Sequence, residues 1–329
     1  MPISHRDLTK RDFLGFSAAA GALACLPAWA QGKPLFDSIN MFVPAAPGGG
    51  WDGTARAIER AAKAAGLVGN MAFENVGGAG GMVGLPRFVN QRKGQGNTLM
   101  VGGSVMVGAA IANKSPVTMR NVTPIARLTE EAGVVVVPAS GKIKTWAELT
   151  AALSANPKAV SVAGGSAGGT DHLILGLMVK ALGRNPKDAA YVAFAGGGPA
   201  NAAIIGGQVV AGISGYSEFE DQIKAGRMIP LATSGRTRIP GVNVPTMTEL
   251  GMNLVMANWR GVFAPPGITP AQREALIAFI TQVRNSAAWQ QELVTRKWAD
   301  AFLTEIPFDR EIRWDIERTE AVMKDLGLA

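Results

Sequence analysis

The sequence contains little of the chemistry that disulfides, metal sites and stacked nucleic acids require. Its 329 residues include one cysteine, Cys25, and two histidines, His5 and His172. A single cysteine cannot form an internal disulfide, and this Cys/His content provides no zinc site, so we predict neither a metal nor a cofactor. Only two tyrosines are present and the basic residues form no single run, which argues against a nucleic-acid partner.

Beyond residue 30 the sequence also lacks an apolar stretch long enough to cross a membrane. At the N-terminus, a basic start precedes an apolar segment, Phe13 to Leu26, and Ala28-Trp29-Ala30 fits a cleavage site. We therefore predict that residues 1–30 are a removable export signal. Lys10-Arg11 resembles a twin-arginine signal with lysine in the first position, which leaves Tat and Sec export both open. The residues before Cys25 make a poor lipobox, so no lipoprotein is expected.

The chain is long enough for about two domains, and 47% of its residues are hydrophobic. Its formal net charge is +7, and it falls to +6 without residues 1–30, which carry three Lys/Arg and two Asp/Glu. A basic chain of this kind fits an acidic small molecule as ligand, although a solvated basic surface would have the same composition.

The most informative stretch begins with an apolar strand, Ile39 to Val43, followed by a proline- and glycine-rich loop, Pro44 to Gly50. Asp52 occupies the expected N-cap, and apolar residues then recur at helical spacing up to Gly66. A glycine loop that leads into a helix N-terminus presents free N–H groups and a partial positive charge. This stretch therefore predicts an anion-binding site.

The same pattern occurs again in the second half of the chain. A strand at 159–163 is followed by the loop Gly164 to Gly169, and Thr170-Asp171 could cap the next helix. A third copy has a strand at 190–194 and the loop Gly196 to Gly198. Repeated strand–loop–helix units predict an α/β fold with mostly parallel sheets, two lobes facing each other across a cleft, and binding loops at the carboxyl ends of strands.

The remaining segments extend this alternation. We expect further strands at 71–74, 99–104, 125–128, 133–137, 209–214, 230–233 and 260–264, and further helices at 82–90, 145–154, 270–296 and 308–326. The 133–137 strand is apolar throughout and should be buried on both faces. Thr145 and Glu148 form a capping box.

Two short motifs suggest enzymes instead. Gly48-x-Gly50-x-x-Gly53, with Glu74 ending the next expected strand, matches a dinucleotide-binding fingerprint and makes an exported NAD(P)-dependent oxidoreductase the alternative function. The match is incomplete, because Pro44 to Pro47 separate the strand from the first glycine. Gly164-x-Ser166-x-Gly168 matches the nucleophile elbow of hydrolases.

A hydrolase also needs a histidine base that can reach its serine. His172 lies six residues after Ser166 on the helix that the motif opens, which is a poor position for that base. His172 is therefore interpreted as a helix-cap or core residue, or as a ligand contact. Glu218 either lines the cleft or anchors Arg260, whose guanidinium fork suits a carboxylate ligand.

These motifs, in this order, resemble the periplasmic receptors of tripartite tricarboxylate transporters, the TctC or Bug family, over nearly the whole chain after residue 30. The resemblance rests on five segments: Val43 to Asp52, Asn75 to Gly81, Gly165 to His172, Ala195 to Ala200 with Gly206 to Val209, and Asn258 to Gly267. Ile213 to Phe219 and Asn258 to Arg260 are more similar to the tricarboxylate branch. The chain departs from the family at Val76 and Gly77, where a basic residue and a proline are usual.

The resemblance implies a two-lobed type II periplasmic binding protein fold whose cleft lies between lobes joined by crossover strands. The expected lobes are 31–137 plus 261–329 and 138–260. It implies a non-enzymatic, monomeric, periplasmic receptor that captures a di- or tricarboxylate such as citrate for one large and one small membrane subunit. The expected ligand-binding residues are Pro47, Gly48, Gly49, Gly50, Trp51, Asp52, Ala79, Gly80, Ser104, Gly165, Ser166, Gly168, Gly169, Thr170, His172, Gly197, Gly198 and Tyr216.

Overall fold

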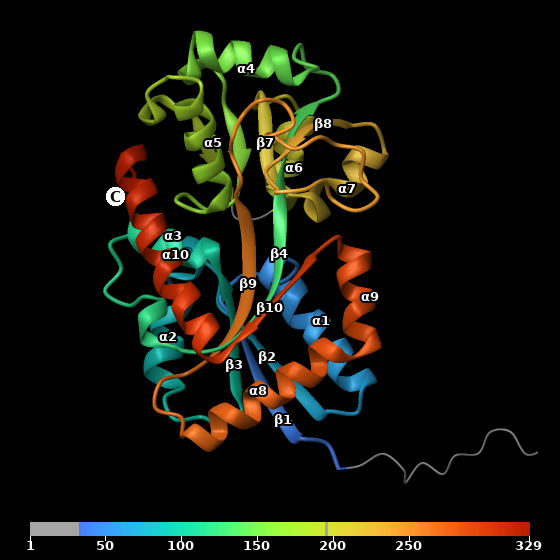
Figure 1. The fold of residues 1–329 in the computed structure, drawn as a ribbon, viewed down its shortest axis with the longest axis vertical. Helices are drawn as coiled ribbons and strands as arrows, with labels where there is room; N and C mark the ends of the chain where they lie inside the picture. Colours follow the sequence, from blue (N-terminus) through green and yellow to red (C-terminus); the bar gives the residue numbers. More distant parts are fainter. Residues whose placement is uncertain (1–32, 195–196) are drawn as a thin grey trace, which may run out of the picture. The chain divides into compact units, whose positions relative to one another are not determined.

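A computed structural model describes residues 33–194 and 197–329. The predicted export signal with Cys25, and Gly196 of the third glycine loop, lie outside the described residues. The segment from Leu35 to Ala329 forms one compact unit (Figure 1). Among the described helices, none has the length and apolar character needed to cross a bilayer.

Strands and helices alternate along this unit. The strands are β1 (Phe36–Val43), β2 (Val68–Asn75), β3 (Thr98–Gly103), β4 (Thr123–Pro138), β5 (Val162–Gly164), β6 (Tyr191–Ala193), β7 (Ala211–Gly215), β8 (Met228–Thr233), β9 (Ala257–Ala264) and β10 (Ala299–Thr304). The α-helices are α1 (Gly50–Ala64), α2 (Gly84–Gln91), α3 (Ser104–Ala112), α4 (Trp146–Ala155), α5 (Thr170–Ala181), α6 (Gly197–Ile205), α7 (Tyr216–Lys224), α8 (Pro270–Asn285), α9 (Ala287–Arg296) and α10 (Glu305–Leu326).

The strands follow the order β2-β1-β3-β9-β4-β7-β5-β6, and β8 and β10 also pair with β4. The pairs that β1 makes with β2 and β3, and those that β5 makes with β6 and β7, are parallel. Every pair made by β4 or β9 is antiparallel. The prediction of mostly parallel sheets is therefore wrong for the centre of the molecule. There β4 carries the chain from the first half to the second, and the antiparallel strand β9 carries it back.

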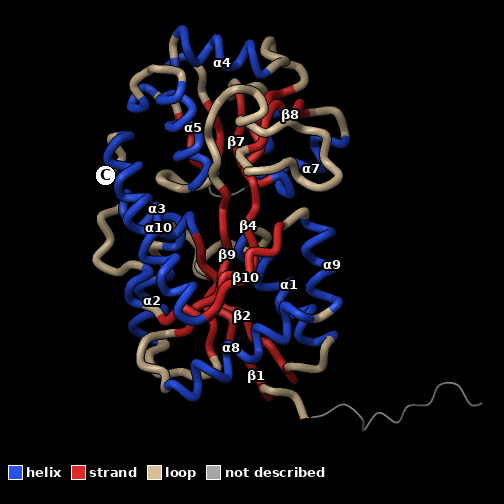
Figure 2. Tube along the Cα trace, in the orientation of Figure 1, coloured by secondary structure: helices blue, strands red, loops and turns tan. Residues whose placement is uncertain are grey.

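Strand β4 joins the two halves (Figures 1 and 2). Up to Ala132 it pairs with β9, and from Gly133 it pairs with β7 and β8. The sequence predicted two separate strands here, and the structure has one. The predicted burial on both faces is confirmed, since Val134 to Val137 are at most 1% exposed.

Two separate groups of apolar side chains fill the two halves. One main core draws on residues 39–128 and 259–316, and another on residues 135–254. The two-lobed α/β fold is thus confirmed. The predicted lobe boundaries at 137/138 and 260/261 stay a proposal, and the strand pairing changes from one sheet to the other slightly earlier, between Ala132 and Gly133.

Further elements also differ from the sequence-based prediction. The expected 270–296 helix is broken at Ser286, which ends α8 and caps α9 by accepting the N–H of Trp289 at 3.2 Å. The loop expected after β3 is helix α3, which is apolar on almost every side and so shows no helical periodicity. Strand β10 was not expected at all. The Thr145–Glu148 capping box is confirmed at the start of α4.

Candidate functional site

The first glycine loop connects the carboxyl end of β1 to α1. Gly48 adopts a left-handed conformation with φ +81, and Gly49 is the N-cap of α1. The prediction that Asp52 is the N-cap is wrong, because Asp52 lies in the third position of the helix. From there its Oδ2 accepts the N–H of Gly48 at 3.0 Å, and its Oδ1 accepts the amide of Asn75 at 3.0 Å. Asp52 thus holds the loop in shape from within the helix.

The charge on Asp52 is stable in this position. Burial works against its ionisation, but the hydrogen bonds from Gly48 and Asn75 and the charge of Arg56 outweigh burial and lower the pKa of this carboxyl. Asp52 therefore accepts both hydrogen bonds at neutral pH, and it keeps the N-terminus of α1 open toward the loop.

The second glycine loop, between β5 and α5, repeats this geometry. Gly168 has φ +77, and the N-cap of α5 is Gly169 rather than the predicted Thr170 or Asp171. The N–H of Gly168 is accepted by Nδ1 of His172 at 3.1 Å, so His172 takes the part that Asp52 has in the first loop. The repeat seen in the sequence is therefore a repeat of backbone structure.

His172 also stacks on Tyr191, with ring centroids 4.3 Å apart and ring planes 4° from parallel. Burial lowers the pKa of His172 to about 4, so the ring is neutral at physiological pH. His172 therefore holds the loop from within α5 and is not the residue that caps the helix, and contact of His172 with a ligand stays a prediction. Because Nδ1 already accepts the N–H of Gly168, His172 is not arranged as the base of a hydrolase.

Replacing His172 with asparagine should make the protein more resistant to mild acid. The unfolded chain takes up a proton near pH 6.5 and the folded His172 only near pH 4, so folding stability is lost as pH falls between these values. We expect folding to lose about 3 kcal/mol of stability through this residue between pH 7 and pH 4, and His172→Asn should not show this loss. Urea unfolding of both proteins at several pH values measures it. Parallel pH profiles for the two proteins would contradict this expectation.

The helices α1 and α5 both begin with free backbone donors. In the described part of the chain, the N–H groups of Gly50, Trp51, Thr170 and Asp171 donate to no protein acceptor. The hydroxyl of Thr170 is also buried without a partner, and the residue is 3% exposed. Buried polar atoms usually have partners, so these groups are suited to a bound anion.

The loops of the two halves lie close together. A Cβ atom built on Gly80, in the loop after β2, would lie 3.4 Å from the Cβ of Ser166. A Cβ atom on Gly108 of α3 would lie 2.0 Å from the carbonyl oxygen of Gly168. Residues that are far apart in the sequence therefore meet where the two halves approach each other, and the predicted residues Gly80, Ser166 and Gly168 are among them.

A buried ion pair lies on the two strands that connect the halves. Nη2 of Arg260, on β9, donates to Oε2 of Glu131, on β4, at 2.9 Å, and both side chains are at most 4% exposed. Oε1 of Glu131 also accepts the N–H and the hydroxyl of Ser217 at the start of α7. Glu218 was predicted either to line the cleft or to anchor Arg260, but the hydrogen-bonded partner of Arg260 is Glu131, which no local pattern indicated.

Two more carboxyl groups lie beside this pair. Burial raises the pKa of Glu218, although the nearby Arg260 acts in the opposite direction. Burial also raises the pKa of Asp171, to about 7, despite the hydrogen bond that Asp171 accepts from the N–H of Gly165 at 2.9 Å. The charges of Glu218 and Glu131 add to this shift, so Asp171 titrates near neutral pH.

Other predicted residues have mainly structural surroundings. The hydroxyl of Ser104 accepts the N–H of Trp259 at 2.9 Å and so joins α3 to β9. Trp51 and Tyr216 are 8% and 6% exposed and pack into apolar cores. Pro47 and Ala79 are exposed in their loops, and Gly197 and Gly198 begin α6. Contact of any of these residues with a ligand stays a prediction.

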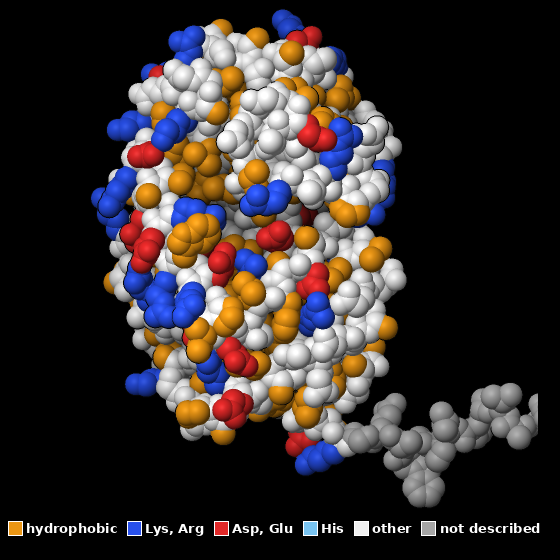
Figure 3. Space-filling view, in the orientation of Figure 1, with side chains coloured by type: hydrophobic (Ala, Val, Ile, Leu, Met, Phe, Trp, Pro, Cys, Tyr) orange, Lys and Arg blue, Asp and Glu red, His pale blue; other side chains and the backbone are white. Residues whose placement is uncertain are grey.

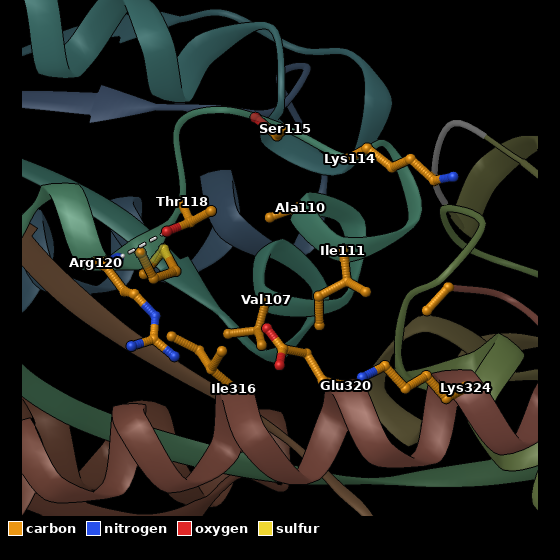
Figure 4. Close-up of a pocket in the computed structure, with 12 residues that line it drawn as sticks. Val107, Ala110, Ile111, Lys114, Ser115, Thr118, Arg120, Ile316, Glu320 and Lys324 are labelled. Atoms are coloured by element: carbon orange, nitrogen blue, oxygen red, sulfur yellow. Dashed lines mark hydrogen bonds between the residues drawn. The ribbon is translucent and has the colours of Figure 1, made fainter.

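One cavity in the described residues lies away from the glycine loops. It measures about 450 Å³ and lies between α3, the segment from Lys114 to Arg120, and α10 (Figure 4). A smaller cavity of about 250 Å³ borders β1 and β2. Neither is lined by a predicted ligand-binding residue. Lys and Arg side chains are scattered over the face shown in Figure 3, in line with the dispersed charge of the sequence.

The chain has clear relatives. Residues 55–328 match the model of the tripartite tricarboxylate transporter family receptor, TctC. The BugT protein of Bordetella pertussis is 28% identical over 320 residues, which are 95% of each chain. The structure of the periplasmic binding protein BugD has a TM-score of 0.77 at 22% identity, over 88% of this chain and 98% of BugD. MatC from Rhodopseudomonas palustris, solved with bound malate, has a TM-score of 0.73 at 26% identity, over 88% and 99%.

Proposed function

Because this chain belongs to the tripartite tricarboxylate transporter receptor family, a family of periplasmic solute-binding receptors, we propose that it captures a di- or tricarboxylate between its two lobes. We further propose that it is exported, acts as a monomer without catalysis, and delivers its ligand to one large and one small membrane subunit. The ligand class is that of a small acid with at least two carboxylates, such as malate or citrate.

One observation carries the proposal: two glycine loops of the same geometry each leave the first N–H groups of a helix free. Asp52 and His172 each accept the N–H of the left-handed glycine, and in the described residues the N–H groups of Gly50 and Thr170 donate to no protein acceptor. Each helix N-terminus stabilises a carboxylate by about 0.3–1 kcal/mol at an exposed site, and by more where water is excluded. Two such termini suit an acid with two separated carboxylates, and malate is the ligand of the related MatC.

The alternative, an exported nicotinamide enzyme, is less well supported. Glu74, which would bind the ribose of a dinucleotide, forms ion pairs with Arg87 and Arg92. A dinucleotide site at the first glycine loop would also give no role to the matching loop before α5. A receptor that binds its ligand from both lobes uses the two loops equally.

Isothermal titration of the chain from residue 31, unfolded and refolded to remove any bound ligand, tests the proposal. Malate, succinate, citrate, tricarballylate, glutamate and NAD are the ligands to compare. Micromolar or tighter binding of one acid, with no heat from NAD, is the expected result. Clear binding of NAD with no response to the acids would replace the receptor by the oxidoreductase.

Replacing Gly53 with alanine provides a second, independent test that distinguishes the receptor from the oxidoreductase. Gly53 lies within α1, and a Cβ there would meet only the terminal Nη1 of Arg296, at 3.3 Å, which can move. We expect Gly53→Ala to raise the free energy of unfolding by about 0.5–1 kcal/mol and to leave carboxylate binding unchanged. In a dinucleotide-binding site the third glycine allows the helix to pack closely on the strand, so an alanine at this position disturbs the site. Loss of ligand binding in Gly53→Ala would therefore favour the oxidoreductase. Urea unfolding and titration measure the two effects.

A further inference from the structure

Three carboxyl groups and one guanidinium lie where the connecting strands pass the ends of α1, α5 and α7: Glu131, Arg260, Glu218 and Asp171. Asp171 is placed there by the sheet, because its Oδ2 accepts the N–H of Gly165 at the end of β5, and β5 pairs with β7, which leads to Glu218 on α7. Arg260 and Glu131 are hydrogen-bonded to each other at 2.9 Å. A Cβ atom on Gly50, at the free N-terminus of α1, would lie 3.4 Å from Oε1 of Glu218 and 3.0 Å from Nη2 of Arg260. The group therefore borders the donors that we assign to the ligand.

The charges in this group do not balance. Arg260 and Glu131 neutralise each other, and the two hydrogen bonds from Ser217 complete the surroundings of Glu131. Glu218 and Asp171 remain as two carboxyl groups that face the same single cation. A dicarboxylate bound at α1 and α5 would bring two more negative charges next to them, and like charges at short range strongly disfavour joint ionisation.

We propose that the receptor captures its dicarboxylate together with one proton, which is held by the Asp171–Glu218 pair. This inference rests on the proposed function. No bond other than those to hydrogen forms or breaks: solvent supplies the proton on binding and recovers it on release. Asp171 is the principal acceptor, because burial and the charges of Glu218 and Glu131 disfavour the ionised form of its carboxyl.

The other titratable groups around Asp171 do not supply this proton. His172, next to it on α5, is neutral above about pH 4 because burial lowers its pKa. Burial and the charge of Asp171 raise the pKa of Tyr191 on β6, which keeps this phenol protonated at neutral pH. Asp52 on α1 has a lowered pKa and stays ionised. Between pH 6 and pH 8.5 the change of charge therefore falls on Asp171, and burial shifts the pKa of Glu218 in the same direction.

The direction of the pH effect follows from the position of Asp171. Its pKa is already raised to about 7 in the protein without ligand, and a neighbouring ligand carboxylate raises it further. The bound state then holds more protons than the free state above pH 7. Affinity should be nearly constant below pH 7 and should fall as pH rises beyond it, by up to about tenfold per pH unit.

Titration calorimetry of the chain from residue 31 with malate, or with citrate if only citrate binds, tests this inference. The experiment is run at pH 8 in phosphate and in Tris, whose ionisation enthalpies differ, so the difference in heat counts the protons taken up. We expect uptake approaching about one proton at pH 8 and much less at pH 6. Equal heats in both buffers at pH 8, with an affinity that does not change between pH 6 and 8.5, would overturn the inference while leaving the receptor function standing. No heat from any acid would overturn both.

Two variants locate the proton. Asp171→Asn keeps an oxygen that can accept the N–H of Gly165, but it cannot titrate, so proton uptake should disappear and affinity at pH 8 should rise relative to the native chain. Glu218→Gln should reduce the uptake by less. Asp221→Asn, at an exposed carboxyl on the same helix as Glu218, is the matched control and should leave the uptake unchanged. Undiminished uptake in both Asp171→Asn and Glu218→Gln would assign the proton elsewhere and overturn the inference. If Asp171→Asn does not fold, the two-buffer result on the native chain and Glu218→Gln still decide.

Discussion

Replacing Arg260 with methionine should lower the free energy of unfolding by about 3–5 kcal/mol, because it leaves the carboxylate of Glu131 buried without its cation. Arg260 is 3% exposed and Glu131 is 2% exposed, so water cannot take the place of the guanidinium. Methionine is long enough to fill much of the space beside Trp298, whose ring lies 5.3 Å from the guanidinium carbon. Urea unfolding at pH 7 measures the loss.

Two further variants show whether the loss comes from the uncompensated charge. The double variant Glu131→Gln with Arg260→Met removes both charges and should be more stable than Arg260→Met alone. Lys180→Ala breaks the pair between Lys180 and Asp325, whose side chains are 51% and 59% exposed, and should cost less than about 1 kcal/mol. A loss below 1 kcal/mol in Arg260→Met would mean that the pair contributes no more than a surface pair.

Replacing Gly108 with alanine should weaken carboxylate binding by at least about 100-fold while the protein stays folded. Gly108 lies on α3, and the added Cβ would lie 2.0 Å from the carbonyl oxygen of Gly168, in the loop before α5. That atom belongs to the backbone of the other half, so the two halves must move apart to make room. The donors at α1 and α5 would then no longer reach one ligand together.

Titration with the acid that binds the native chain, together with a thermal unfolding curve, separates the two effects of Gly108→Ala. Gly53→Ala is the matched control, because it adds the same methyl group to a helix of the first half without touching the second. Native affinity in Gly108→Ala would show that the close approach of α3 to Gly168 is not needed for binding.

The features predicted well from the sequence depend on neighbouring residues. The glycine loops before α1 and α5, the capping box at Thr145 and the burial of Val134 to Val137 can all be seen within a few positions of the chain. The repeat of the loops, and their order along the chain, identified the fold and the family. These predictions succeeded because local backbone preferences and apolar patterns act over short distances.

The N-cap residues of α1 and α5 were predicted wrongly, and the cause is again local. Asp52 and Asp171 are suitable N-cap residues, but glycines can also occupy this position, and Gly49 and Gly169 do so here. The side chains then reach back from inside the helix, as Asp52 does to the N–H of Gly48. Composition alone does not distinguish these two arrangements, because an aspartate in either position accepts a backbone N–H near the start of the helix.

The two-lobed α/β fold, the family and the loops that offer free N–H groups could be predicted from the order of residues in the chain. The pairing of Arg260 with Glu131, 129 positions away, and the unbroken course of β4 between the halves became visible only in the folded molecule, as did the position of Asp171 beside the end of the strand next to the one that leads to Glu218. This is because the surroundings of a buried charge depend on which distant residues the fold places beside it. Such partners lie far apart in the chain, and no pattern in a single sequence shows that they are close together in the folded protein.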